Sequence, residues 1–426
     1  SRHSTHSDET MNIKALFERD NRKRLGDVCL NIGATALFNM VLQFALYPYF
    51  LRCLGEETYG VALSLLSLVA IIAAPFGYAA NYSRLVNEKA LRPANGDYLL
   101  PLFLSAFIGI FYLWYLELLT PVTIGLYAAL MFFTVFRCYS DVEFKLNVNF
   151  LRYFFFYLAI SVGYLAGLLV YRWTGQWLTA ILTGEILGIL YSAFASKIYH
   201  RPLRPSQNFG LVCKSIGLLF LSNLLENLTL NADRLLLLAM EGGTAVTIYY
   251  TASLFGKVVA LLTVPVNSLV ISYLIRYDKG LSKKLWTIFV VCGIGGGLVC
   301  TGGCILFSHI FIPFLYEELY ETVKPFLVPA ILSQIFYFVS GILLVVLLRF
   351  RGEKKQFFLN LIYAVSFFAL VIAGTYFYGL EGFVWFSLIA NAFRFIIVVI
   401  WGFFSSRDKK SDSPSIQSAE ESITGG

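Results

Sequence analysis

Long apolar runs recur along almost the whole chain and decide what it can fold into. Each is about 20 residues or longer, the length that an α-helix needs to cross about 30 Å of hydrocarbon. The runs are apolar on all sides instead of alternating, which disfavours the strands of a β-barrel. With 58% hydrophobic and only 14% charged residues, the 426-residue chain has too few polar residues to cover the surface of a water-soluble protein of its size. The sequence therefore predicts an all-α integral membrane protein.

The apolar runs predict about twelve transmembrane helices in two six-helix lobes. The helices span about residues 28–51, 58–80, 98–116, 120–138, 148–171, 177–196, 209–240, 244–275, 285–308, 323–349, 357–378 and 381–404. The predicted order is a charged arm (1–27), an N-lobe with helices one to six (28–206), a C-lobe with helices seven to twelve (207–404) and a polar tail (405–426). Residues 1–10 precede Met11 and are left out of the fold prediction.

The basic residues predict on which side of the membrane the chain begins and ends. Most of the 33 Lys and Arg fall in the arm, the tail and every second connection, whereas the intervening connections hold Arg52, Arg172 and Lys324. Because basic residues accumulate in cytoplasmic loops, both termini are predicted to be cytoplasmic. This bias also accounts for the net charge of +7, so no nucleic-acid partner is expected.

The connections between the predicted helices are too short to hold a separate catalytic domain. The seven cysteines and four histidines form no disulfide framework, metal-ligand spacing or catalytic triad. Neither an enzyme nor a bound cofactor or metal is therefore expected. The glycine-rich stretch 293–297 lies within an apolar run, where small residues let helices approach closely, and it is not expected to bind phosphate.

Polar and charged residues inside the apolar runs mark the predicted working surface. An ionised group at the bilayer centre costs about 2.5–3.5 kcal/mol on insertion scales, so it is expected to face a partner or water. On the seventh predicted helix, one side carries Asn223, Glu226, Asn227, Asn231, Asp233 and Arg234. Lys257 and Arg394 fall near the middle of helices eight and twelve, and Glu185 lies within helix six.

These residues predict a central polar cavity. Substrate binding is assigned to Lys257, Arg394, Asn223, Asn227 and Arg234, and ion coupling to Glu226, Glu185 and Asp233. The alternative is a purely structural role, in which Glu226 pairs with Lys257 and Glu185 pairs with Arg394. Both interpretations stay open at this point.

Prolines inside the predicted spans indicate bends. Pro48, Pro75, Pro265 and Pro329 each remove a helical hydrogen bond and permit a kink. Bent helices suit a transporter that works by alternating access, although static kinks would leave the same pattern.

Two stretches resemble the polysaccharide flippases of the Wzx type, in the superfamily that also holds the multidrug and toxic compound extruders. The first, Ala45 to Leu68, reads ALYPYFLRCLGEETYGVALSLLSL and is similar to the family's Leu-Gly turn followed by Tyr-Gly. The second, Asn231 to Ala252, reads NADRLLLLAMEGGTAVTIYYTA and is similar to the Asp-Arg, Leu-rich and Gly-containing pattern that opens the second lobe. The positions that match are Gly55, Tyr59, Gly60, Asp233 and Arg234.

The resemblance implies a flippase that moves a polyprenyl-diphosphate-linked oligosaccharide from the inner to the outer leaflet by alternating access. The repeat unit would belong to O-antigen lipopolysaccharide, capsule or a related polymer, and the location would be the bacterial cytoplasmic (inner) membrane. The implied partners are the lipid-linked substrate, membrane lipids, a polysaccharide polymerase and a chain-length regulator. The family's cavity is expected to be cationic, whereas the charges predicted here are of mixed sign.

Three other functions compete with this one. A cation-coupled multidrug extruder shares the fold, but it would favour an acidic cavity, and Lys257 and Arg394 are cationic. A membrane glycosyltransferase or polymerase is disfavoured by the short outer loops. A channel is disfavoured because no repeated filter segment occurs.

Overall fold

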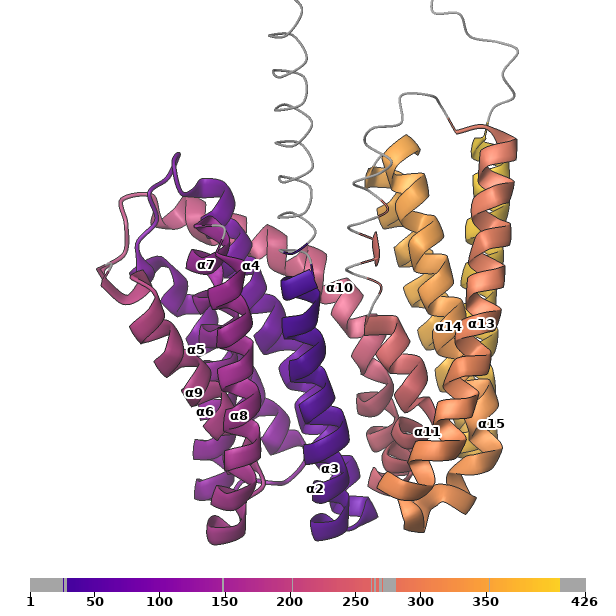
Figure 1. Cartoon of the computed structure of the whole chain (residues 1–426), viewed down its shortest axis with the longest axis horizontal. Coiled ribbons are helices and arrows are strands. Elements are labelled where there is room, and N and C mark those ends of the chain that lie inside the picture. The colour runs from indigo at the N-terminus through magenta and orange to yellow at the C-terminus, as the bar shows by residue number, and fades with distance from the viewer. Residues whose placement is uncertain are drawn as a thin grey trace, which may run out of the picture. The chain divides into compact units, whose positions relative to one another are not determined.

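The structure, a computed structural model, describes residues 26, 29–147, 149–200, 202–261, 263, 266–267, 270, 281–351 and 353–406. Within these ranges every regular element is helical, as predicted (Figure 1). The first span, Cys29–Leu54, ends in α2 (Tyr47–Leu54). The helices that follow are α3 (Glu56–Leu68), α4 (Ala74–Asn87), α5 (Leu99–Tyr115), α6 (Pro121–Ser140), α7 (Val142–Leu146), α8 (Phe150–Thr174), α9 (Leu178–Ala195), α10 (Phe209–Glu241), α11 (Gly243–Leu261), α13 (Lys283–Leu315), α14 (Tyr320–Arg351) and α15 (Glu353–Ser405).

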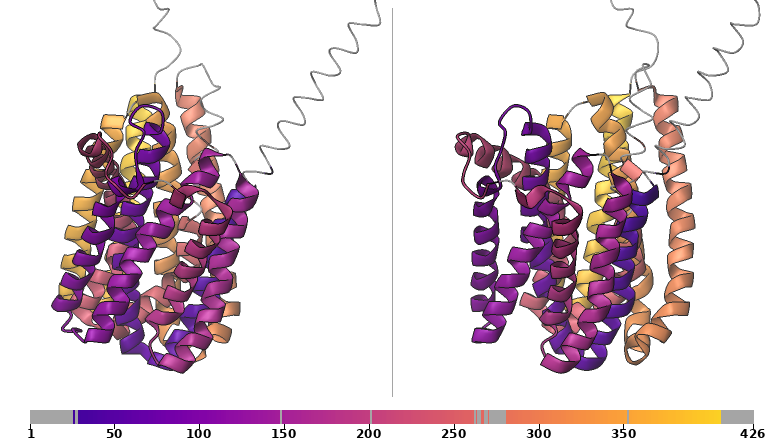
Figure 2. Two further views of the ribbon diagram at one scale, coloured as in Figure 1. Left: turned by 90° about the vertical axis from the view of Figure 1, so that its left-hand side faces the viewer. Right: turned by 60° about the vertical axis from the view of Figure 1, so that its left-hand side comes forward.

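The helices form two compact units, Ser1–Thr247 and Ile248–Gly426, called unit 1 and unit 2 below. In unit 1, α5, α6, α8 and α9 run side by side along a common direction (Figure 2). The seventh predicted helix, α10, packs against α3 and α4, where the rings of Phe76 and Phe220 stack at 3.8 Å, and it therefore lies in unit 1. The division into two six-helix lobes stays a prediction, as does the cytoplasmic location of the termini. The arm up to residue 25 and the tail from residue 407 lie outside the described residues.

Fewer helices qualify as membrane spans than the sequence predicted. Within the described residues nine are long and apolar enough, and the bent α10 would be a tenth. The predicted eighth helix, 244–275, begins as α11, and most of it beyond residue 261 lies outside the described residues. The predicted eleventh and twelfth helices form one element, α15, which counts once.

A backbone reversal at Gly379 divides α15 into two arms. Gly379 has φ 59° and ψ −143°, a conformation that is readily adopted only by glycine. The hydroxyl of Tyr363, on the first arm, donates a hydrogen bond to Asn391 Oδ1, on the second arm, at 2.6 Å. Residues this far apart cannot touch within one continuous helix, so the two arms lie antiparallel. The arms correspond to the predicted helices 357–378 and 381–404.

Two of the predicted proline bends are π-helical turns. One spans Leu42–Leu46 just before Pro48, and the other spans Val69–Ala73 just before Pro75. A proline ring clashes with the carbonyl of the residue four positions earlier, and a wider turn at that point relieves the clash. Pro329 lies inside α14, and Pro265 lies outside the described residues.

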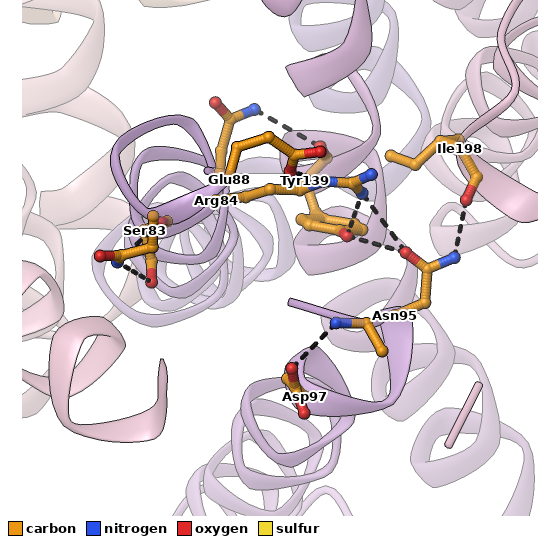
Figure 3. A network of polar contacts seen from close by, with 10 residues as sticks. Ser83, Arg84, Glu88, Asn95, Asp97, Tyr139 and Ile198 are labelled. Carbon is orange, nitrogen blue, oxygen red and sulfur yellow. Dashed lines mark hydrogen bonds and ion pairs between the residues drawn. The ribbon is translucent and has the colours of Figure 1, made fainter. Parts of the chain in front are cut away.

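A buried polar network ties together the connections at one end of unit 1 (Figure 3). Arg84, which is fully buried, donates to the Tyr139 hydroxyl and to Asn95 Oδ1. Asn95 also accepts from the Tyr139 hydroxyl at 2.9 Å and donates to the backbone carbonyl of Ile198 at 2.7 Å. Asp97 links the same two loops, because its Oδ1 accepts a hydrogen bond from the backbone N–H of Ser206 at 2.6 Å. The loops that follow α4 and α9 are thereby held against the end of α6.

Candidate functional site

The residues predicted for transport are divided between the two units. Glu185, Asn223, Asn227, Asp233 and Arg234 lie in unit 1. Lys257 and Arg394 lie in unit 2. The backbone of Glu226 belongs to α10, but its side chain lies outside the described part of the structure. The pairing of Glu226 with Lys257 therefore stays a prediction.

Glu185 forms a buried ion pair with Arg137, which lies near the end of the predicted helix 120–138. Its Oε2 lies 2.5 Å from Nε of Arg137, which belongs to α6, and both side chains are buried. The Tyr164 hydroxyl donates to Glu185 Oε1 at 3.0 Å, and the Arg137 guanidinium lies 5.1 Å from the ring centroid of Phe38. The partner of Glu185 is thus Arg137 instead of Arg394. Helical periodicity gave no information on which neighbouring helix Glu185 would face.

The asparagine side chains of α10 donate hydrogen bonds to their own helix. The side-chain amides of Asn223 and Asn227 donate to the backbone carbonyls of Leu219 and Asn223, at 3.0 and 2.9 Å. Asp233 is buried, and its Oδ1 accepts the backbone N–H of Arg234 at 2.9 Å. Both residues make further contacts.

Arg394 is a buried cation with no acidic partner among the residues that the structure describes. Only 7% of the residue is exposed, and the guanidinium carbon lies 4.2 Å from the ring centroid of Tyr337 and 4.6 Å from that of Tyr363. Among the described residues no carboxylate lies within ion-pair distance of Arg394, and its Nη1 has no hydrogen-bond partner. The two tyrosine rings fix the plane of the guanidinium and leave donors for an anionic ligand.

A chain of hydrogen bonds holds Tyr363, one of the two tyrosines beside Arg394, in place. Tyr363 donates to Asn391, whose amide in turn donates to the Ser333 hydroxyl of α14 at 2.8 Å. All of these side chains are buried. The position of Arg394 is therefore set by α14 and by both arms of α15.

Lys257 is the second buried cation of unit 2. It is 8% exposed, and its Nζ lies 5.7 Å from the ring centroids of both Tyr249 and Tyr250, with other contacts besides. Tyr249 also packs edge-on against Phe383 of α15, at 4.8 Å. A residue of α15 thus contributes to the aromatic surroundings of Lys257.

The two stretches that carried the family resemblance contact each other in unit 1. The carboxylate of Glu57 accepts the backbone N–H groups of Gly243 and Thr244 at 2.9 and 2.8 Å, and the Thr244 hydroxyl at 3.0 Å. A Cβ on Gly60 would lie 1.8 Å from the carbonyl oxygen of Gly243, so the contact requires glycine. Gly55 provides the turn before α3 at φ 77°, and Tyr59 is fully buried.

Sequence reasoning did not single out Glu57. Two sequence features could have indicated its role. Glu57 lies two positions after Gly55 of the Leu54-Gly55 turn, and the pair Gly242-Gly243 lies at the start of α11. A carboxylate is a favourable cap for the exposed N–H groups of a helix N-terminus.

In the described ranges no group of three His, Cys, Asp or Glu residues is placed to hold a metal ion. Unit 2 holds two buried cations, Arg394 and Lys257, and α10 in unit 1 carries a series of side-chain amides.

No family model and no curated protein sequence matches the chain. Solved structures do match, across most of their length. The lipid II flippase MurJ, in an inward closed conformation, is 17% identical, with 87% of each chain covered and a TM-score of 0.62. An inward-facing multidrug resistance MATE family transporter of the MOP superfamily is 14% identical, with 88% of this chain and 94% of that chain covered and a TM-score of 0.57.

The MATE transporter VcmN of Vibrio cholerae, in its bent form, is 12% identical, with 90% of this chain and 98% of that chain covered and a TM-score of 0.54. These three structures are transporters or flippases and not enzymes. At such identities the likeness concerns the fold. The chain is a multi-pass, all-α membrane protein whose fold is similar to that of these MATE transporters and of MurJ.

Proposed function

We propose that this protein is a flippase for a polyprenyl-diphosphate-linked oligosaccharide, of the Wzx type, in a bacterial cytoplasmic membrane. The observation that carries the proposal is Arg394, a buried cation held between Tyr337 and Tyr363 with no acidic partner among the described residues. Holding a charge inside a membrane protein is costly, and such residues are usually kept for a substrate or ion path. A diphosphate is the anion that this lipid-linked substrate would bring.

Lys257 supports the same assignment. It supplies a second buried cation in unit 2, surrounded by tyrosine rings. An Arg can bind phosphate oxygens through two parallel N–H groups, and a Lys adds a point charge. Together they would offset the desolvation of a diphosphate during its passage across about 30 Å of hydrocarbon.

The contact of Glu57 with Gly243 and Thr244 supports alternating access. It joins two turns that the predicted topology places at the outer surface, and it consists of hydrogen bonds at the ends of helices, which can break and re-form without unfolding either helix. Transport toward the outer leaflet would then proceed as the cytoplasmic side closes and this contact opens.

A cation-coupled multidrug extruder of the same fold remains the alternative, and the surroundings of Glu185 bear on it. A coupling carboxylate needs to exchange its proton or ion with water, whereas Glu185 is 2% exposed and paired with Arg137. Coupling through Glu185 would first require this pair to separate. Partnership with a polysaccharide polymerase and a chain-length regulator belongs to the flippase proposal.

The test is a leaflet-accessibility assay in proteoliposomes with a fluorescent polyprenyl-diphosphate oligosaccharide. The wild-type protein is expected to speed flipping over protein-free liposomes, and Arg394→Ala to slow it about tenfold or more, as for a lost hydrogen-bonded charge. Arg394→Lys should retain part of the activity. Lys324→Ala is the matched control, since Lys324 is half exposed and pairs with the exposed Glu321.

Wild-type protein that does not speed flipping would refute the flippase assignment. Normal flipping by both Arg394→Ala and Lys257→Ala would leave the function standing and refute the proposed anion site. Uptake of a cationic drug against its gradient, without lipid flipping, would establish the extruder instead.

A further inference from the structure

The second arm of α15 carries buried polar side chains along one of its faces. Ser387, Asn391 and Arg394 are four and then three residues apart, so they lie on the same side of the helix. Only 1% of Ser387, 3% of Asn391 and 7% of Arg394 is exposed. Polar groups buried in a membrane helix are expected to meet partners, and these three residues differ in whether they do.

Asn391 has partners at both ends of its amide. Its Oδ1 accepts a hydrogen bond from the Tyr363 hydroxyl at 2.6 Å, and its Nδ2 donates to Ser333 Oγ of α14 at 2.8 Å. These bonds hold the second arm against the first arm and against α14. Asn391 therefore has a structural role.

Two donors on the same face have no partner. Nη1 of Arg394 and Oγ of Ser387 are both buried, and neither forms a hydrogen bond within the described part of the chain. A buried hydroxyl on a helix can donate to a carbonyl of the preceding turn, as the equally buried Thr375 of the first arm does to Val371 at 2.7 Å. Unpaired buried groups destabilise a fold, so two of them on one face indicate an acceptor that arrives with a ligand.

The position of the Arg394 guanidinium brings the two donors toward each other. Side chains of an α-helix lean toward its N-terminus, so Arg394 reaches back along the arm in the direction of Asn391. Its guanidinium carbon lies 4.6 Å from the ring centroid of Tyr363, whose hydroxyl bonds to Asn391, in agreement with this direction. Ser387 is one turn further along the same face, a rise of about 6 Å. One ligand with two linked anionic groups would therefore meet both donors.

Lys257 lies toward the other end of this face. Phe383, which is fully buried one turn before Ser387, packs edge-on against Tyr249 with ring centroids 4.8 Å apart. Nζ of Lys257 lies 5.7 Å from the Tyr249 ring centroid. Along the arm, Ser387 thus lies between Phe383, which contacts an aromatic neighbour of Lys257, and Arg394.

We propose that the Ser387 hydroxyl binds the second phosphoryl group of the transported lipid's diphosphate, while Arg394 binds the first. The inference rests on the proposed flippase function and deepens it, because it assigns the residue that distinguishes a diphosphate lipid from a monophosphate lipid. An Arg can hold one phosphoryl group through two parallel N–H groups, which leaves the second group to a donor further along the arm. A hydroxyl suits that position, since it donates to a phosphate oxygen without adding another buried charge.

The burial of Ser387 sets when this contact can form. Because only 1% of the residue is exposed, the lipid reaches it in a state of the transport cycle in which the surrounding side chains have moved apart.

The test measures the affinity of the full-length protein in nanodiscs for two fluorescent lipids, a polyprenyl diphosphate and the polyprenyl monophosphate of the same chain length. The wild-type protein is expected to prefer the diphosphate. Ser387→Ala should weaken binding of the diphosphate lipid about tenfold, because a hydrogen bond to a charged group is lost, and should leave binding of the monophosphate lipid unchanged. Arg394→Ala should weaken binding of both lipids.

Ser308→Ala is the matched control. Ser308 is also buried, and its hydroxyl also has no partner in the described structure, but it belongs to α13, which carries neither Arg394 nor Lys257. Each serine variant removes a buried unpaired hydroxyl, so neither is expected to lower the midpoint of thermal unfolding. Only Ser387→Ala should change the preference for the diphosphate lipid.

The remaining outcomes separate this inference from the proposed function. Equal losses of affinity for both lipids in Ser387→Ala, no loss for either, or the same change in Ser308→Ala would overturn the role of Ser387 while the flippase assignment stands. The same holds for wild-type protein that binds the two lipids equally well. Wild-type protein that binds neither lipid would refute the flippase and the role of Ser387 together.

Discussion

The carboxylate of Glu57 accepts the backbone N–H of Gly243 at 2.9 Å, which joins the start of α3 to the start of α11 within unit 1. The two residues are 186 positions apart in the chain. Each belongs to one of the two stretches that resemble flippase motifs. The two stretches therefore meet at one contact, where an acidic side chain caps a helix that begins with glycine.

Glu57→Ala is expected to lower the free energy of unfolding by about 1 kcal/mol, because the cap is lost at a largely solvent-exposed position. The midpoint of thermal unfolding in detergent measures the change. Glu56→Ala is the matched control, since Glu56 contributes its backbone carbonyl to Thr247 and not its carboxylate. Equal losses in the two variants would contradict a specific role of Glu57.

Glu185→Leu is expected to destabilise the protein by about 3–5 kcal/mol, because it leaves the buried Arg137 cation without its counterion. Replacing both partners, as Arg137→Met with Glu185→Leu, should recover much of that loss. Thermal unfolding of the single and double variants gives the comparison. A Glu185→Gln variant that unfolds normally but no longer transports would instead favour the predicted ion-coupling role.

Asn95→Leu is expected to loosen the loops that follow α4 and α9. The substitution removes hydrogen bonds to Arg84, Tyr139 and the Ile198 carbonyl, all of them buried. Trypsin should then cleave faster after the exposed Lys197, as mass spectrometry of a timed digest would show. Thr120→Ala, which removes the cap of α6 at another connection, should leave that rate unchanged. An unaltered rate at Lys197 in Asn95→Leu would refute the coupling of these loops.

Gly402→Ala is expected to destabilise unit 2 by about 1–3 kcal/mol through overpacking. A Cβ at this position would lie 1.9 Å from the ring of Trp286, whose indole N–H is held by the Val399 carbonyl at 3.1 Å. Gly295→Ala on α13 is the control, because no atom lies within 4 Å of its added Cβ. That variant should gain about 0.8–1 kcal/mol from helix propensity. The midpoint of thermal unfolding should fall for Gly402→Ala and rise for Gly295→Ala, relative to the wild-type protein. Any other result for Gly402→Ala would contradict the packing described for Trp286.

The sequence determined the class of the protein, since long uniformly apolar runs are stable only as membrane helices. Their bounds agree with the structure within three residues for the first, third, fifth and sixth spans, whereas the second and fourth spans extend farther, to Asn87 and Leu146. The prolines also predicted where two helices depart from regular α-helix. The clash of Pro48 and Pro75 with the preceding turn depends only on local geometry, and a π-helical turn precedes each of them.

Only the tertiary structure decided which charged residues face one another. Periodicity places Glu185 on a side of its helix but does not fix the rotation of that helix, so its partner became Arg137 and not Arg394. The same limit hid Glu57, whose role depends on a backbone more than 180 positions away. Arg394 was recognised in the sequence because it lies within an apolar run. Its two tyrosine neighbours could not be recognised there, since one belongs to α14 and the other to the first arm of α15, and they meet only when these helices pack.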